Sequence, residues 1–178
     1  MVIIMNIKII KVGYLECNCY ILEKNNKVLV VDPGDDYDKI KEELKDKEVL
    51  GILITHSHFD HIGCIKDIVN DYKVEVYSYD NLEEKSYEIG CFKFNVIHTP
   101  GHSPDSICFY FEKNKIMFTG DFLFYDTIGR CDLEGGDYQV MLQSIKKIKQ
   151  YDKEITIYPG HGIKSTLERE FKYNPYFN

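Results

Sequence analysis

A short apolar, strand-like run that ends in a turn and a metal-binding side chain recurs along this 178-residue chain. Four runs lead in this way into His56, His102, Asp121 and His161. Each residue then lies just beyond the carboxyl end of its strand, and ligands from different strands can converge at one rim of a fold. The pattern therefore predicts several strands that share a polar site at their ends.

The densest group of potential ligands is the run His56-Ser57-His58-Phe59-Asp60-His61. In an extended segment His56, His58 and Asp60 point to one side, and His61 begins the next helix. Imidazole and carboxylate groups suit zinc, iron and manganese. The helical motif of zinc proteases, two histidines at i and i+4 with a glutamate between them, is absent here. A single histidine is more often a core or surface residue, but this cluster with three downstream partners favours a metal site.

The remaining chain is predicted to be mixed α/β. Three strands at 3–12, 17–23 and 27–32 predict an antiparallel meander, followed by a helix at about 37–48 with Ile40 and Leu44 on its buried face. Further strands are expected at 49–55, 74–78, 88–98, 106–111, 115–119 and 154–158, and further helices at about 61–70 and 137–150. Many strands with interspersed helices indicate a layered α/β fold, and periodicity alone goes no further.

Length and composition indicate an ordinary globular chain, which we interpret as a single domain over residues 1–178. No apolar run approaches the roughly 20 residues that span a bilayer, so no membrane partner is expected. The first residues lack the features of a secretory signal, which predicts a cytoplasmic protein.

The six cysteines form no CxxC pair and are expected to be free thiols. A net charge of −7 without a basic stripe argues against nucleic acid as a partner.

Four motifs together resemble the metallo-β-lactamase superfamily. They are Thr55-His56-Ser57-His58-Phe59-Asp60-His61, Thr99-Pro100-Gly101-His102-Ser103, Thr119-Gly120-Asp121 and Pro159-Gly160-His161-Gly162. The resemblance begins at Val31-Asp32-Pro33-Gly34 and spans nearly the whole chain. It implies an αββα four-layer sandwich, the fold of that superfamily. The segment Ile128-Gly129-Arg130-Cys131-Asp132-Leu133 is similar to the small glyoxalase II-like, or hydroxyacylglutathione hydrolase-like, branch.

The resemblance also implies a centre with two divalent metal ions. Zinc is the expected metal, and iron and manganese are the alternatives. One ion would be held by His56, His58 and His102, and the other by Asp60, His61 and His161. Asp121 would bridge the two ions, and zinc β-lactamases generally lack this aspartate. Asp60 and Asp121 are the implied catalytic residues. His98 falls outside the motif and is interpreted as a core residue or as a hydrogen-bond partner of a ligand.

The activity expected from this resemblance is hydrolysis of a small, anionic thioester such as a hydroxyacylglutathione. Arg130 is the candidate substrate-binding residue, and the alternative is a structural arginine paired with Asp132 or Asp137. Because the chain ends soon after His161, recognition is expected from residues 122–136, the region near Tyr14 and the C-terminal tail. Alternative activities are those of a mononuclear-iron persulfide dioxygenase or of a lactone or phosphodiester hydrolase. A structural or electron-transfer metal module is the alternative outside catalysis, and the sequence leaves the oligomeric state open.

Overall fold

The computed structural model describes residues 5–177, and within this range the chain forms two large sheets and one short hairpin. The first sheet contains β1 (Asn6–Val12), β2 (Cys17–Lys24), β3 (Lys27–Val31), β4 (Glu48–Leu53) and β5 (Glu75–Tyr77). The second contains β6 (Ser86–Ile89), β7 (Phe92–His98), β8 (Ile107–Phe111), β9 (Ile116–Gly120), β12 (Thr156–Pro159) and β13 (Ser165–Thr166). The hairpin pairs β10 (Leu123–Phe124) with β11 (Thr127–Ile128).

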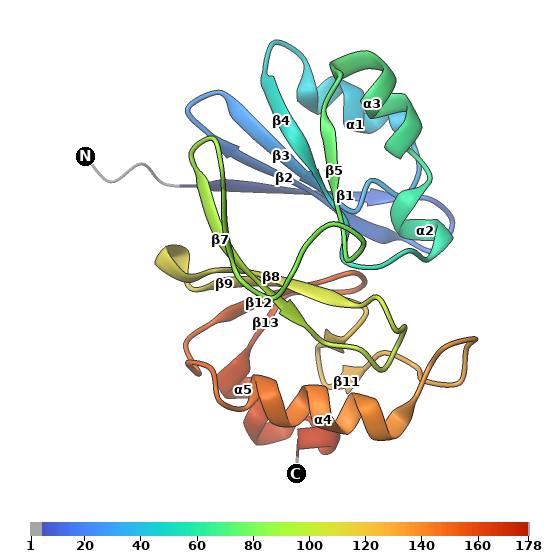
Figure 1. The fold of residues 1–178 in the computed structure, drawn as a ribbon, viewed down its shortest axis with the longest axis vertical. Helices are drawn as coiled ribbons and strands as arrows, with labels where there is room; N and C mark the ends of the chain where they lie inside the picture. The colour runs from blue at the N-terminus through green and yellow to red at the C-terminus, as the bar shows by residue number, and fades with distance from the viewer. Residues whose placement is uncertain (1–4, 178) are drawn as a thin grey trace.

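Helices cover the outer faces of both sheets, so the molecule has four layers (Figure 1). The first sheet carries α1 (Tyr37–Leu44) and α3 (Ile65–Tyr72), and α2 (Phe59–Ile62) lies where the two halves meet. The second sheet carries α4 (Tyr138–Ile148) and α5 (Leu167–Tyr173). A 3-10 turn, Glu112–Asn114, joins β8 to β9, and a second, Pro175–Phe177, follows α5. This arrangement confirms the αββα sandwich that the resemblance implied.

The alternation of side chains along the strands explains the layers. On β2, Tyr20 and Leu22 face the second sheet and pack in a core with its phenylalanines. Their neighbours Cys19 and Ile21 face the other way, against α1 and α3. Successive strand residues point to opposite faces, so a strand that is apolar throughout must be covered on both sides. A third core beneath α4 and α5 covers the outer face of the second sheet.

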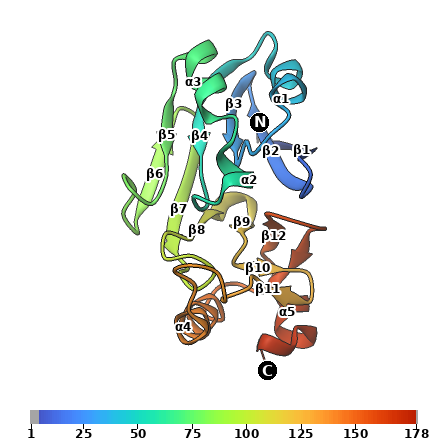
Figure 2. The same cartoon turned by 90° about the vertical axis from the view of Figure 1, so that its right-hand side faces the viewer.

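The topology places the carboxyl ends of the ligand-bearing strands at one rim. In the first sheet β1, β2 and β3 form the predicted antiparallel meander, and β4 and β5 then add in parallel. In the second sheet β7 and β9 both lie antiparallel to β8, while β12 is parallel to β9. Strands β7, β9 and β12 therefore end on the same side, and Figure 2 shows β9 and β12 reaching toward α2.

Three sequence predictions differ from the structure. The helix expected at 61–70 is two helices, because the chain turns at residues 63–64 between α2 and α3. The strand expected at 88–98 is the hairpin β6–β7, which turns at Gly90 with a left-handed φ of 56°. The hairpin β10–β11 and helix α5 were not predicted. The first residues of the strand expected at 3–12 lie outside the described range. No helix within residues 5–177 is long and apolar enough to cross a membrane.

Candidate metal centre

All seven predicted ligands meet at the rim between the two sheets. His56 and His58 follow β4, and Asp60 and His61 lie on α2. The other three residues follow strands of the second sheet: His102 follows β7, Asp121 follows β9 and His161 follows β12. The cluster therefore draws on both halves of the sandwich.

The backbone of α2 is pressed against the turn after β3. Gly34 lies so close to this helix that a Cβ added there would be 1.6 Å from the carbonyl oxygen of Asp60. No side chain fits in that space, so glycine is required for α2 to approach β3. The predicted Pro33-Gly34 turn thus also sets the position of Asp60 and His61.

One group of three histidines has its ring nitrogens in contact. His58 Nδ1 lies 3.1 Å from His56 Nε2 and 2.9 Å from His102 Nε2. A tetrahedral zinc ion with bonds of roughly 2.05 Å separates its nitrogen ligands by about 3.3 Å. Both distances are close to the spacing that such an ion requires, and the three ligand atoms all lie within 4.8 Å of one another.

The second group consists of Asp60, His61, His161 and Asp121. His161 Nε2 lies 3.1 Å from Asp60 Oδ2 and 3.6 Å from Asp121 Oδ2. His61 Nε2 lies 3.4 Å from Asp121 Oδ1 and 3.7 Å from Asp60 Oδ2. Asp121 Oδ2 also lies 3.7 Å from His102 Nε2 in the first group. Asp121 is thus the residue between the two groups.

Four of the five histidine rings are held through the nitrogen that faces away from the centre. In each case Nδ1 contacts an oxygen and Nε2 faces the cluster. The contacts are His56 with Thr55 Oγ1 at 3.1 Å, His61 with Asp32 Oδ2 at 2.9 Å, His102 with the Arg130 carbonyl at 2.8 Å and His161 with the Leu15 carbonyl at 3.0 Å. Such outer partners orient metal-binding rings and leave Nε2 free to bind.

Asp32 is a buried partner of the centre that the sequence prediction did not single out. Its carboxylate accepts hydrogen bonds from the Thr55 amide at 2.8 Å and the Thr55 hydroxyl at 2.7 Å, as well as contacting His61. Asp32 has a left-handed φ of 51°. A sequence signal was present, because Asp32 follows the apolar strand β3 as Asp121 follows β9.

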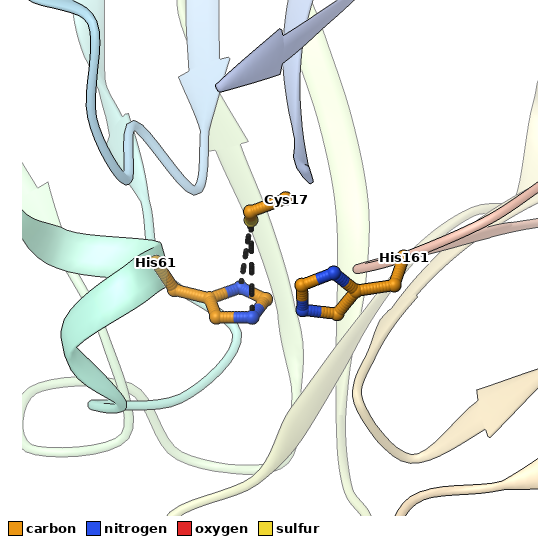
Figure 3. A group of neighbouring side chains, drawn as sticks. All are labelled: Cys17, His61 and His161. Carbon is orange, nitrogen blue, oxygen red and sulfur yellow. Dashed lines mark hydrogen bonds between the residues drawn. The ribbon is translucent and has the colours of Figure 1, made fainter. Parts of the chain in front are cut away.

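Cys17 adds a thiol to the second group (Figure 3). Its sulfur lies 3.5 Å from His61 Nδ1 and 3.8 Å from His61 Nε2. The potential ligand atoms of Cys17, His61 and His161 all lie within 4.8 Å of one another. Burial raises the pKa of Cys17 to about 11, although the hydrogen bond with His61 opposes this. The thiol is therefore neutral at physiological pH and acts as a packing partner of the His61 ring.

The charges of the centre are strongly coupled. Burial opposes a charge on His61, but the carboxylates of Asp32 and Asp121 outweigh it and hold the pKa of that imidazole well above its usual value. Burial and the adjacent His61 hold the pKa of His56 well below its usual value. Burial would raise the pKa of Asp121, yet the neighbouring histidines, His61 foremost, lower it strongly. The centre therefore places ionised carboxylates next to histidine rings. Carboxylates and imidazoles together form a set of donors that binds divalent cations.

Two further observations fit a metal ion at this place. Asp121 Oδ1 is buried and accepts no hydrogen bond of good geometry among the described residues, although His61 Nε2 lies 3.4 Å away. A buried carboxylate oxygen left without a partner costs free energy that a bound cation would recover. A Cβ on Gly160 would be 2.2 Å from this oxygen and 2.7 Å from His61 Cε1. The loop after β12 therefore needs glycine at this position, because a larger residue would collide with Asp121 and His61.

A cavity of about 1090 Å³ opens over the centre. Its lining includes the predicted ligands His58, Asp60, His102, Asp121 and His161. The sequence prediction placed recognition in 122–136 and near Tyr14, and the lining includes Phe124, Gly129, Arg130, Leu133, Glu134 and Leu15. Residues of the C-terminal tail, which was also a candidate, are not among the residues that line this cavity.

The two predicted outlying residues have different surroundings. Arg130 lines the cavity and also forms two hydrogen bonds with Asp132, each 2.7 Å long. Arg130 thus forms the ion pair with Asp132 that the structural role requires, and substrate binding by Arg130 stays a prediction. His98 lies beside Tyr79, with ring centroids 5.1 Å apart, and is in none of the potential ligand groups found within residues 5–177.

Comparison with known proteins agrees with this geometry. The family model described as the metallo-beta-lactamase superfamily matches residues 12–86 and 79–161. The hydroxyacylglutathione hydrolase GloC of Haemophilus influenzae is 29% identical, with 98% of this chain and 99% of that protein aligned. The probable metallo-hydrolase YqgX of Bacillus subtilis is 31% identical, with 94% and 95% aligned.

Two solved structures share the fold over almost their whole length. The crystal structure of the B3 metallo-beta-lactamase BLEG-1 superposes with a TM-score of 0.91 at 33% identity, covering 97% of this chain and 99% of that one. The di-iron-bound form of TTHA1623 superposes with a TM-score of 0.86 at 31% identity, covering 95% and 99%. With its strand order, its ligand motifs and these similarities, the chain belongs to the metallo-β-lactamase superfamily.

Proposed function

We propose that this metallo-hydrolase uses two divalent metal ions to cleave a thioester. The observation that carries the proposal is the pair of adjacent ligand groups joined by Asp121, whose Oδ1 is buried and accepts no hydrogen bond of good geometry among residues 5–177. Thioester specificity is supported by full-length similarity to a protein named as a hydroxyacylglutathione hydrolase. The cavity above the centre is large enough for a small-molecule substrate.

The proposed ligands follow the two groups. His56, His58 and His102 would hold one ion, Asp60, His61 and His161 the other, and Asp121 both. When bound, such an ion pair supplies a water of lowered pKa, a polarised carbonyl and compensation for the charge of the leaving group. Zinc fits the imidazole and carboxylate donors, and the di-iron form of TTHA1623 makes iron an alternative, with manganese a third.

Asp60 is the proposed proton carrier of the reaction. Burial would raise its pKa, but the hydrogen bond with His161 and the charge of His61 lower it, so the carboxylate is ionised. It can accept a hydrogen bond from the attacking water, orient it, take its proton and deliver that proton to the departing thiolate. His161 fixes the carboxylate through the 3.1 Å contact between Nε2 and Oδ2.

The ligand assignment is tested by counting metal in variants. We expect two equivalents in the loaded protein, one in His58→Ala, and less than one at a matched free-metal concentration in Asp121→Ala, because a bridge serves both ions. Elemental analysis after equilibrium dialysis measures this. Equal residual metal in the two variants, or one equivalent in the unaltered protein, contradicts the dinuclear centre.

The reaction is tested by comparing two chemistries on zinc-loaded and iron-loaded protein. We expect cleavage of S-lactoylglutathione or another thioester under nitrogen, because hydrolysis needs no oxygen. Oxygen uptake with glutathione persulfide, without cleavage of any thioester, would instead identify a persulfide dioxygenase. A chromogenic β-lactam belongs in the panel because BLEG-1 is described as a β-lactamase, and we expect the thioester to be preferred.

A further inference from the structure

A small groove adjoins the main cavity at His161. It has a volume of about 280 Å³, which is small for a complete ligand site but adequate for one arm of a substrate. The groove and the cavity share Phe124 and His161. Because His161 lines the groove and its Nε2 lies 3.1 Å from Asp60 Oδ2, the groove lies next to the candidate metal centre.

The lining of the groove has no carboxylate and no lysine or arginine, and its polar residues are Tyr125, Thr127 and His161. It consists of Phe124, Tyr125, Thr127, His161, Gly162 and Ile163. Ile163 is 63% exposed and Tyr125 is 39% exposed, although both are large hydrophobic residues. These two exposed apolar side chains, next to the polar centre, offer a contact surface for an apolar group.

The Tyr125 side of the groove is held by contacts with a neighbouring arginine. The Arg169 guanidinium lies 3.6 Å from the centroid of the Tyr125 ring. The same guanidinium donates hydrogen bonds to two carboxylates. Arg169 Nη2 lies 2.9 Å from Asp126 Oδ2, and Arg169 Nη1 lies 3.1 Å from Glu170 Oε1. A wall that is already ordered loses little entropy when a ligand binds.

The main cavity is lined by several acidic residues, in contrast to the groove. Apart from the ligands, its lining carries the acidic residues Asp80, Asp105 and Glu134. Arg130 is the basic residue of that lining, and it is neutralised by Asp132 at 2.7 Å. The groove, which has no carboxylate in its lining, thus suits an uncharged arm of the substrate.

We propose that the groove holds the acyl chain of the substrate, so that the preferred substrates are thioesters of apolar, medium-length fatty acids rather than of short hydroxy acids. The inference rests on the proposed thioester hydrolysis. An acyl chain in the groove leaves its carbonyl carbon at the ligands, and the thiol portion extends into the main cavity.

Binding is tested first, on metal-free protein, with the uncleavable thioethers S-octyl- and S-ethyl-N-acetylcysteamine. By calorimetry we expect the octyl compound to bind at least about tenfold more tightly, because its additional methylenes are buried. Ile163→Ser, which removes an apolar wall, and Thr127→Trp, which fills the groove, should each abolish most of this difference. Ile9→Ser alters an isoleucine on β1 that is 44% exposed and lines neither cavity, and should retain it.

Turnover is tested next, on metal-loaded protein, with octanoyl and acetyl thioesters of N-acetylcysteamine. We expect the ratio of kcat/KM for octanoyl over acetyl to exceed about ten, and to fall about fivefold or more in Ile163→Ser but not in Ile9→Ser. Groove-dependent binding of the octyl compound without cleavage of either thioester supports the groove and contradicts the proposed function. Equal turnover of both thioesters, with binding unchanged in both groove variants, overturns the inference while the proposed function stands.

Discussion

At the scale of single residues, the centre depends on side chains that would not touch a metal. Asp32 shows this most clearly, because its two carboxylate oxygens serve Thr55 and His61 together. It is 1% exposed, so water cannot replace either contact. The orientation of the His61 ring on α2 is therefore set by Asp32, which follows strand β3.

Replacing Asp32 tests this role. Asp32→Asn puts an amide NH2 group where a carboxylate accepts hydrogen bonds, so either Thr55 or His61 loses its acceptor. Loss of such an outer partner typically weakens metal binding by roughly 10- to 100-fold, and we expect this for one of the two metal equivalents. Competition with a chromophoric chelator measures the affinities. Asp38→Asn, at an exposed position on α1, is the matched control, and equal affinities in the two variants would refute the role.

His98 provides the opposite test. Its ring packs against Tyr79, and the main-chain atoms of His98 bond to Glu84 and Lys147. We therefore expect His98→Ala to keep the full metal content measured by elemental analysis. Loss of a whole equivalent would show that His98 is a ligand and that the assignment above is incomplete.

At the scale of elements, strand β2 holds the loop that carries His161. The Tyr20 hydroxyl and the Asn18 amide both donate hydrogen bonds to the Pro159 carbonyl, and Asn18 also donates to the Gly162 carbonyl at 3.1 Å. The backbone amide of Asn18 donates to the Gly160 carbonyl at 2.7 Å. These contacts join the first sheet to the connection that follows β12 in the second.

Tyr20→Phe tests this coupling between elements. The change removes one buried hydrogen bond and almost no apolar area, so we expect a loss of about 1 kcal/mol in the free energy of unfolding. We also expect weaker binding of one metal equivalent, because His161 follows the released loop. Urea unfolding and chelator competition measure the two effects. Tyr110→Phe on β8, a strand that supplies no ligand, should leave metal binding unchanged, and identical metal affinities for the two variants would rule out the coupling.

At the scale of the whole molecule, the proposed ligands lie on both sides of the sandwich. His56, His58, Asp60 and His61 come from the first half of the chain, and His102, Asp121 and His161 come from the second. Bound metal would therefore resist separation of the two sheets as well as local unfolding at the rim.

Metal removal should consequently lower the melting temperature. A ligand at 1,000 times its dissociation constant stabilises the folded state by about 4 kcal/mol. For a chain of this length, that corresponds to a decrease of about 10 °C when the metal is chelated. Calorimetry with and without a chelator, followed by restoration with zinc, measures the change. The same melting temperature in both forms would show that the metal does not join the two halves.

The cysteines test burial across the whole fold. All six are free in the structure, and Cys17, Cys19, Cys64 and Cys108 are buried. Burial raises the pKa of Cys108 to about 12, so it is protonated as well as shielded. We expect an aromatic disulfide reagent to detect six thiols in the unfolded, unreduced protein, but only Cys91 and Cys131 rapidly in the folded one. Fewer than six in the unfolded protein would reveal a disulfide.

The sequence by itself determined the order of most elements and the identity of the candidate ligands. Apolar runs buried on both faces identify the strands locally, and strand ends predict where polar side chains emerge. The helix over Tyr138–Ile148 was found because its apolar stripe repeats at helical spacing. The division at residues 63–64 was missed because an apolar pattern continues through a turn that only packing against the β3 turn imposes.

Only the tertiary structure decided which residues meet. Asp32 and His61 are far apart in the sequence, and their contact depends on how closely α2 approaches β3 at Gly34. Cys17 was expected to be a free thiol in the core, and its place beside the His61 ring follows from the pairing of the strands and the packing of α2. The apolar groove joins residues of the β10–β11 hairpin to the loop after β12. Local periodicity carries no information about such distances, because they are set by the packing of whole layers.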